Sequence, residues 1–234
     1  MVSLSNNPAY SILRVKFKKL GDLQYISHLD LVRTMHRIVV RSGLPLWYTE
    51  GFNPKPKMTF AAPLSVGTES LCEFMDVRVT KRLPEDEIVA RLNANMTEEM
   101  QVLEAYYPER PITDLGYLAY TVEIHTGGVA EEVAQKCREA LNAPKIEIVK
   151  KTKSSDSAVV DIKPLIKEVS VSTKGDELVI GCILSASPSA FLNPEHVVSY
   201  LRSSVGILAD PVITNEWYTV LRTNAYFPDM TPFR

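Results

Sequence analysis

Residues 11–43 read SILRVKFKKLGDLQYISHLDLVRTMHRIVVRSG, and this stretch decides the fold of the first half of the chain. Side chains alternate in character over residues 11–17, which predicts a strand. Ser27 and Asp30 have the spacing of a capping box, in which the hydroxyl and the carboxylate each satisfy a backbone N–H, so a helix is expected to begin there. Gly43 is expected to end the helix, with Pro45 just beyond it.

Working outward from this stretch, strand and helix patterns follow one another in the order βαββαβ, which is typical of the ferredoxin-like or split βαβ fold. The first half is expected to add strands at 58–61, 73–79 and 100–106 and a helix at 84–95, followed by a linker at 108–114, PERPITD. The second half is expected to contain strands at 119–125, 145–150, 168–173, 177–184 and 216–224, helices at 130–142 and 194–203, turns at Gly127-Gly128 and Lys174-Gly175-Asp176, and a polar stretch at 151–157. We therefore predict an α+β protein with mainly antiparallel sheets and two ferredoxin-like domains, residues 1–112 and 113–234.

The composition is that of an ordinary globular protein. Of the 234 residues, 45% are hydrophobic and 23% charged, which excludes a mostly disordered chain, a collagen and a coiled coil. No apolar stretch approaches the roughly 18 residues that span a bilayer, and residues 1–10 lack a signal-type apolar core, so we expect a cytoplasmic protein with no membrane partner. The three cysteines are far apart and form no CxxC, so neither a disulfide framework nor a metal site is predicted, and we expect no cofactor.

Charge is distributed unevenly along the chain. Residues 1–60 hold nine Lys or Arg and three Asp or Glu, a net charge of +6, whereas the remainder has a net charge of −8. Such asymmetry indicates an anionic partner for the first part of the chain.

Three arginines, Arg33, Arg37 and Arg41, follow one another at intervals of four on the expected helix. Stacked like charges at that spacing repel one another, so they favour an anionic counterpart. One interpretation is a row that binds phosphates, because the planar guanidinium binds oxyanions bidentately. The other is a solvated face, or arginines that bridge to Glu50, Glu69 or Glu73. The same helix is expected to bury an apolar stripe made of Leu29, Val32, His36, Val39 and Gly43, with Val40 alongside.

The loop at 51–57, GFNPKPK, combines aromatic and basic residues. Phe52, Asn53, Lys55 and Lys57 are expected to bind single-stranded nucleic acid, in which bases stack and phosphates pair with cations. Trp47 and Tyr48 lie just before the loop, and core residues of a short strand are the alternative interpretation for them. The two prolines stiffen the loop and lower the entropy cost of binding.

Catalytic candidates are few. His28 and Asp30 lie beside the expected helix cap: a histidine could act as general acid or base, while a capping role explains Asp30 equally well. His36 is expected to be a core histidine. Asp161 and Lys163 lie two apart on a segment expected to be extended, where both would point to the same side, a carboxylate beside a phosphate-binding amine. A turn with a surface ion pair is the alternative.

Several runs together resemble the radical SAM-linked protein family, whose members lie beside, or are fused to, radical SAM proteins with a B12-type domain. These runs are YISHLDLVR at 25–33, SGLP at 42–45, EGFNPKPK at 50–57 and PLSVGTES at 63–70, with a weaker match at Asp161–Leu165. The resemblance implies a radical SAM protein as partner. It also marks motif residues whose role it does not define, namely His28, Asp30, Arg33, Gly51, Phe52, Asn53, Pro54, Pro56, Gly67 and Glu69. Because the chain lacks the C-x3-C-x2-C cysteines, it is not expected to be a radical SAM enzyme itself.

These observations support three hypotheses. The first is an accessory protein of a radical SAM enzyme that binds RNA or a ribosomal component through Arg33, Arg37, Arg41, the 51–57 loop and Lys163. The second is an enzyme that processes or modifies RNA with His28, Asp30 and Asp161. The third is a pure protein-interaction subunit whose arginines dock on acidic patches of the partner. We expect a non-enzymatic role.

Overall fold

The computed structural model describes residues 9–126, 130–151, 157–208 and 215–234. These residues divide into two compact units, the first comprising Met1–Leu115 with Thr231–Arg234 and the second Gly116–Met230. Both units are α+β with antiparallel strand pairs, which confirms the predicted class. The predicted turn at Gly127-Gly128 and most of the predicted polar stretch, 152–156, lie outside the described residues.

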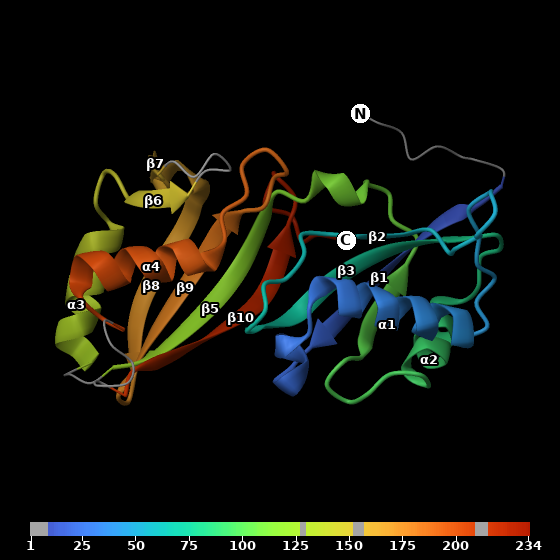
Figure 1. Ribbon diagram of the computed structural model, residues 1–234, viewed down its shortest axis with the longest axis horizontal. Helices are drawn as coiled ribbons and strands as arrows, with labels where there is room; N and C mark the ends of the chain where they lie inside the picture. The colour runs from blue at the N-terminus through green and yellow to red at the C-terminus, as the bar shows by residue number, and fades with distance from the viewer. Residues whose placement is uncertain (1–8, 127–129, 152–156, 209–214) are drawn as a thin grey trace. The chain divides into compact units, whose positions relative to one another are not determined.

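In the described residues of the first unit lie four strands, two α-helices and two short 3-10 helices; Figure 1 labels the strands and the α-helices. In chain order they are β1 (Ser11–Lys19), η1 (Gly21–Tyr25), α1 (His28–Arg41), β2 (Met58–Phe60), β3 (Thr68–Val79), α2 (Glu85–Asn93), β4 (Val102–Tyr106) and η2 (Ile112–Asp114). The strands are ordered β4-β1-β3 with β2 on the other side of β3, and every pair is antiparallel. Helices α1 and α2 pack on one face of this sheet, because residues of both helices form one core with the alternate side chains of β1 and β3.

Helix α1 begins as its capping motif predicts. The Ser27 Oγ accepts a hydrogen bond from the backbone N–H of Asp30 at 3.2 Å. The Asp30 carboxylate accepts a hydrogen bond from the Ser27 hydroxyl at 2.8 Å. In a full capping box this carboxylate would instead accept from the backbone N–H of the N-cap residue. Gly43 adopts a φ of +66° just after the helix, the left-handed conformation that favours glycine.

The predicted apolar stripe of α1 is wrong. The helix buries Leu31, Met35, Ile38 and Val39, whereas Leu29 is 60% exposed and Val40 is 45% exposed. This helix has more apolar residues than one face can bury. Two different sets of residues therefore satisfy a spacing of three and four, the predicted stripe and the buried one, and Val39 belongs to both. His36 is half-buried beside the true stripe rather than in the core.

Where the structure describes it, the second unit has a sheet of four strands, a separate two-stranded pair and two α-helices. Its elements are β5 (Tyr117–His125), α3 (Ala130–Leu141), β6 (Glu147–Lys151), β7 (Ser157–Asp161), η3 (Lys163–Leu165), β8 (Ile166–Lys174), β9 (Glu177–Ser185), α4 (Pro194–Val205) and β10 (Trp217–Tyr226). The sheet has the order β10-β5-β9-β8, while β6 pairs with β7 alone. The predicted turn at Lys174-Gly175-Asp176 is confirmed as the connection from β8 to β9, with Lys174 as the last residue of β8.

Strand β7 was not predicted. It is only five residues long and begins at the end of a polar run, where no alternation extends far enough to indicate a strand. Its last residue leads into a helical turn, because Ile162 has a φ of −95° and a ψ of −6° and Lys163 begins η3. The expected extended conformation of 161–163 is therefore wrong.

Candidate nucleic-acid interface

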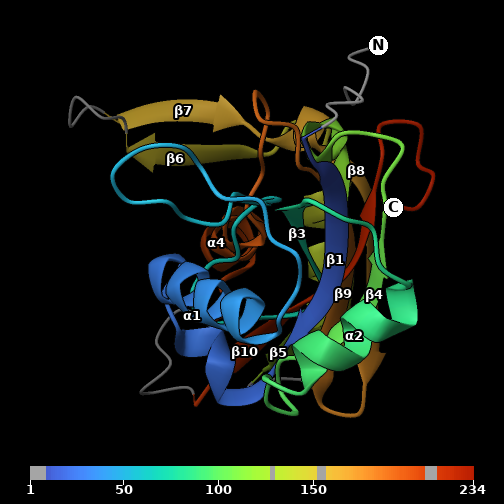
Figure 2. The same ribbon diagram turned by 90° about the vertical axis from the view of Figure 1, so that its right-hand side faces the viewer.

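A hairpin-like segment between α1 and β2, residues 46–57, carries the predicted basic loop; we call it the basic hairpin. Its two arms pair with each other, since the N–H of Thr49 donates to the carbonyl of Lys55 at 2.9 Å and Tyr48 forms a bridge with Pro56. The same segment is anchored on β3, where the N–H of Trp47 donates to the Arg78 carbonyl at 2.9 Å. A rigid sheet therefore positions a protruding tip, the light blue segment between α1 and β2 in Figure 2.

The tip of the basic hairpin presents its aromatic and basic side chains to solvent. Phe52 has a relative exposure of 112%, and Asn53, Lys55 and Lys57 are also exposed. Gly51 enters the tip with a φ of +119°, a conformation that L side chains rarely adopt. Tyr48 is 44% exposed, so it is not a core residue, whereas Trp47 is half-buried and packs on Tyr10 with ring centroids 5.3 Å apart.

The arginine row lies on the exposed face of α1. Arg33 forms an ion pair with Asp30 at 3.0 Å, in which both side chains are more than half exposed. Neither Arg37 nor Arg41 forms an ion pair with any carboxylate in the part of the chain that the structure describes. In the described residues, the arginine row therefore forms no ion pair with Glu50, Glu69 or Glu73. The guanidinium groups of Arg37 and Arg41 remain available to a partner.

Part of the positive charge of the first sixty residues is used inside the first unit. Arg14 is fully buried and binds Asp76 bidentately, with its Nε 2.7 Å and its Nη2 3.0 Å from the two carboxylate oxygens. The same guanidinium donates to the carbonyls of Arg110 and Arg234 at 3.1 and 3.3 Å. Lys16 pairs with Glu104 at 2.8 Å. Burial raises the pKa of Asp76 even though Arg14 lies beside it. The loss of solvation therefore outweighs the effect of the nearby positive charge.

The Arg14–Asp76 pair was missed because its partners are 62 residues apart. They are directly opposite in the register of β1 and β3. Alternation along each strand places both side chains on the face away from α1 and α2, and this is the only signal the sequence offers.

Asp30 and His28 have different surroundings. The hydrogen bond from Ser27, followed by that from Arg33, lowers the pKa of Asp30, so this carboxylate stays ionised as a cap and ion-pair partner. The His28 ring lies edge-on to Phe60 at a centroid distance of 5.5 Å. Its buried Nδ1 has no hydrogen-bond partner among the described residues, and the same holds for Nε2 of His36.

Asp161 and Lys163 are engaged by backbone groups of the second unit. The Asp161 Oδ1 accepts from the N–H groups of Ile146 and Lys163, both at 3.0 Å, and these bonds lower its pKa. The Lys163 Nζ donates to the carbonyl of Leu141 at 2.7 Å, at the C-terminal end of α3. Asp161 thus stabilises a turn and Lys163 a helix end. The other catalytic candidates, His28 and Asp30, belong to the first unit, whereas Asp161 belongs to the second.

Within the described residues, no group of three His, Cys, Asp or Glu is arranged to hold a metal ion. No helix in the described part of the chain is long and apolar enough to cross a membrane. The three cysteines are free and buried.

The fold and the interface define an α+β protein with an exposed basic-aromatic hairpin. The chain belongs to the family described as "Uncharacterized protein conserved in bacteria (DUF2344)", which it matches over residues 13–194. No curated protein matches the sequence.

Solved structures resemble the chain only remotely. An unknown protein from Galdieria sulphuraria is 12% identical with a TM-score of 0.26, over 91% of this chain and 98% of that one. DyPB from Rhodococcus jostii RHA1 is 9% identical with a TM-score of 0.20, over 94% of each chain.

Proposed function

We propose that the protein binds a single strand of RNA through the basic hairpin and the arginine row, as an accessory protein of a radical SAM enzyme in the cytoplasm. One observation carries the RNA-binding proposal. Four cations without an ion pair to any described carboxylate, Arg37, Arg41, Lys55 and Lys57, accompany a fully exposed Phe52. Stacking of a base on an aromatic ring, next to cations that pair with phosphates, is how single strands are bound without sequence preference.

The chain order favours a common surface for these groups. Only four residues separate Arg41, at the end of α1, from Leu46, where the basic hairpin begins. The hairpin is fixed to β3 by backbone hydrogen bonds and by the packing of Trp47 on Arg78, which leaves the exposed side chains of Phe52 and Lys55 for a partner.

We also propose that each unit is a variant of the ferredoxin-like fold. The order β4-β1-β3-β2 in the first unit and the order β10-β5-β9-β8 in the second correspond strand by strand, with β6 and β7 as an insertion in the second. RNA-binding modules are frequent on this fold. The reducing compartment suits three free cysteines.

Fluorescence anisotropy of a labelled, unstructured RNA tests the proposal. Lys55→Gln combined with Lys57→Gln is expected to weaken binding by about tenfold or more, because each lost phosphate contact removes a charge-assisted bond. Lys136→Gln combined with Lys145→Gln is the matched control, since both are exposed lysines of the second unit. Equal affinity of the two double variants would refute the proposed interface.

A second candidate function has its own support. Leu29 and Val40 are exposed on α1 alongside the arginines, an apolar and basic combination that suits a groove with acidic edges on a partner protein. In that case a radical SAM partner would bind α1 directly. Capture of the partner by the purified protein would then survive nuclease treatment and fail with Leu29→Asp, whereas an RNA bridge would be lost with the nuclease.

A further inference from the structure

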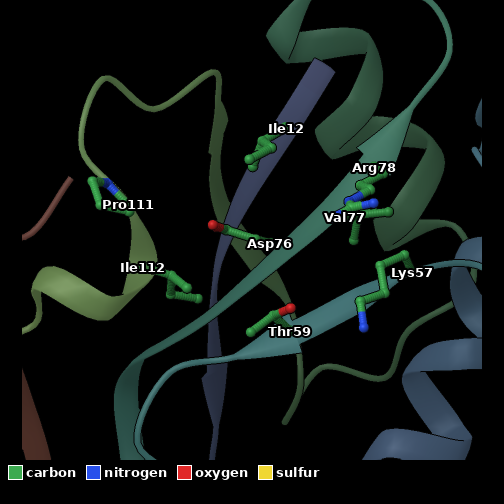
Figure 3. Close-up of a pocket in the computed structure, with 8 residues that line it drawn as sticks. All are labelled: Ile12, Lys57, Thr59, Asp76, Val77, Arg78, Pro111 and Ile112. Atoms are coloured by element: carbon green, nitrogen blue, oxygen red, sulfur yellow. The ribbon is translucent and has the colours of Figure 1, made fainter. Parts of the chain in front are cut away.

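A small pocket opens on the face of the first unit's sheet opposite α1 and α2 (Figure 3). It has a volume of about 120 Å³, and its walls come from β1, β2, β3, the end of the basic hairpin and η2 with the residue before it. The lining residues are Ile12, Lys57, Thr59, Asp76, Val77, Arg78, Pro111 and Ile112. All of them belong to the first unit.

The charges that line this pocket do not cancel. Asp76 is neutralised from behind by the bidentate Arg14. Lys57 is exposed, Arg78 is half-buried, and neither has an ion pair with a carboxylate of the described ranges. The lining therefore carries two cations without a counter-charge.

Aromatic rings hold Arg78 in place. Its guanidinium carbon lies 4.1 Å from the centre of the Tyr10 ring and 5.1 Å from that of Trp47. Cation–π contacts leave the N–H groups at the edge of the guanidinium free to donate. The Arg78 backbone is fixed as well, because its N–H donates to the Lys57 carbonyl at 3.2 Å.

Size and charge select the ligand. The pocket is much smaller than the roughly 300–1,000 Å³ that drug-sized ligands occupy, so it admits one small group. A phosphate monoester carries a charge of about −1.5 to −2 at neutral pH, which matches two uncompensated cations, whereas a carboxylate or a phosphodiester carries one charge. The Thr59 hydroxyl adds a neutral donor, and Ile112 and Pro111 form an apolar wall that limits water.

We propose that this pocket binds a phosphate monoester group, with Lys57 and Arg78 as its cationic ligands. The site goes beyond the strand-binding surface described above, with which it shares only Lys57. Its ligand is a terminal phosphate, either of a free small molecule or at the end of an oligonucleotide.

Trp47 offers a direct readout, because it lies against Tyr10 and close to Arg78. The chain has two tryptophans, so Trp217→Phe leaves Trp47 as the single tryptophan, which is excited selectively over the tyrosines at long wavelength. In this background, titration with inorganic phosphate is expected to give a saturable change in fluorescence, and acetate at equal ionic strength is not. A linear response to phosphate, or the same response to acetate, would overturn the proposal.

Variants locate the site. Lys57→Gln is expected to raise the Kd for phosphate about tenfold or more, the usual effect of losing a charge-assisted hydrogen bond. Lys55→Gln is the matched control, since Lys55 is an exposed lysine of the same hairpin that does not line the pocket. Arg78→Lys keeps the charge without the fork and is expected to weaken binding as well. An unchanged Kd in Lys57→Gln refutes the site, whatever Arg78→Lys does to the fold.

The source of the phosphate is settled by competition. A 5′-phosphorylated oligonucleotide that binds more tightly than its 5′-hydroxyl counterpart, and is displaced by inorganic phosphate, supports a strand terminus as the ligand. Equal binding of the two oligonucleotides with retained phosphate binding supports a free small molecule. The two proposals are tested separately by the same variants. Both lysine variants are expected to weaken RNA binding, whereas only Lys57→Gln is expected to weaken phosphate binding.

Discussion

At the scale of single residues, the buried Arg14–Asp76 pair determines much of the first unit's integrity. The guanidinium is completely buried and joins the strands to the carbonyls of Arg110 and Arg234. Removing one member of a buried pair leaves an uncompensated charge, so Asp76→Asn is expected to lower the free energy of unfolding by about 3–5 kcal/mol. Urea denaturation measures this change.

The neighbouring pair of the same strand serves as the control. Lys16 and Glu104 are partly exposed, and such pairs contribute about 0–1 kcal/mol. Glu104→Gln is therefore expected to have a small effect. If the two substitutions were equally mild, the structural role assigned to Arg14 would be wrong.

Asp161 is expected to contribute an acid-sensitive part of the stability. The backbone N–H of Ile146 and then that of Lys163 lower its pKa, so the folded state binds this proton less readily than the unfolded state. The stabilisation is complete above the unfolded pKa of about 4 and is lost as the pH falls through the lower, folded pKa. The free energy of unfolding should thus decline less steeply in Asp161→Asn than in the wild type below about pH 5.

The control for this prediction is Asp176→Asn, at the exposed turn between β8 and β9. Its stability should follow the wild-type pH dependence. Parallel curves for Asp161→Asn and the wild type would show that the turn does not depend on the ionised carboxylate.

At the scale of elements, α1 combines a buried face with an exposed face that carries the arginine row. Met35 is completely buried, so Met35→Ala is expected to destabilise the protein by about 2–5 kcal/mol. Leu29 is 60% exposed, and Leu29→Ala is expected to change stability by no more than about 0.5 kcal/mol. Thermal and urea unfolding of the two variants decide which stripe is buried, and the reverse ranking would restore the stripe that spacing alone predicts.

The basic hairpin is expected to separate stability from binding. Phe52 contacts solvent on all sides, so Phe52→Ala should leave the free energy of unfolding unchanged within about 0.5 kcal/mol. The free energy with which this variant binds single-stranded RNA should weaken by about 1–3 kcal/mol, the usual contribution of one stacked base. Phe52→Trp should retain binding. An unaffected affinity in Phe52→Ala would exclude stacking at the tip.

Local patterns predicted most of the elements, and long-range contacts account for what they missed. The cap at Ser27 and the alternation of β1 are local, so the sequence alone indicates them. The choice between two stripes of α1 depends on which face meets the sheet, a contact that spacing does not encode. The exposure of Phe52 could be anticipated from its Gly and Pro neighbours. The position of the Arg78 guanidinium could not, because it depends on Tyr10 and Trp47, which come from separate segments.

At the scale of the whole molecule, the charge asymmetry needs a finer interpretation than a count. Among the described residues, Arg14, Lys16 and Arg33 pair with carboxylates of the chain, and the buried Lys19 donates to the carbonyl of Leu23 at 3.1 Å. Arg37, Arg41, Lys55 and Lys57 have no such pair among the residues described and lie on one helix and the hairpin that follows it. The proposed binding of an anionic strand therefore assigns the contacts to this subset of the basic residues, and the affinity should depend on that subset.

The salt dependence of RNA binding tests this account most directly. Each phosphate contact to a single strand contributes about −0.7 to the slope of log K against log salt, so four contacts predict a slope of about −3. The combined variant Arg37→Gln, Arg41→Gln, Lys55→Gln, Lys57→Gln should bind weakly with a slope near zero, while Arg202→Gln with Lys136→Gln keeps the wild-type slope. A wild-type protein that binds no RNA, or a combined variant with an unchanged slope, would contradict the account.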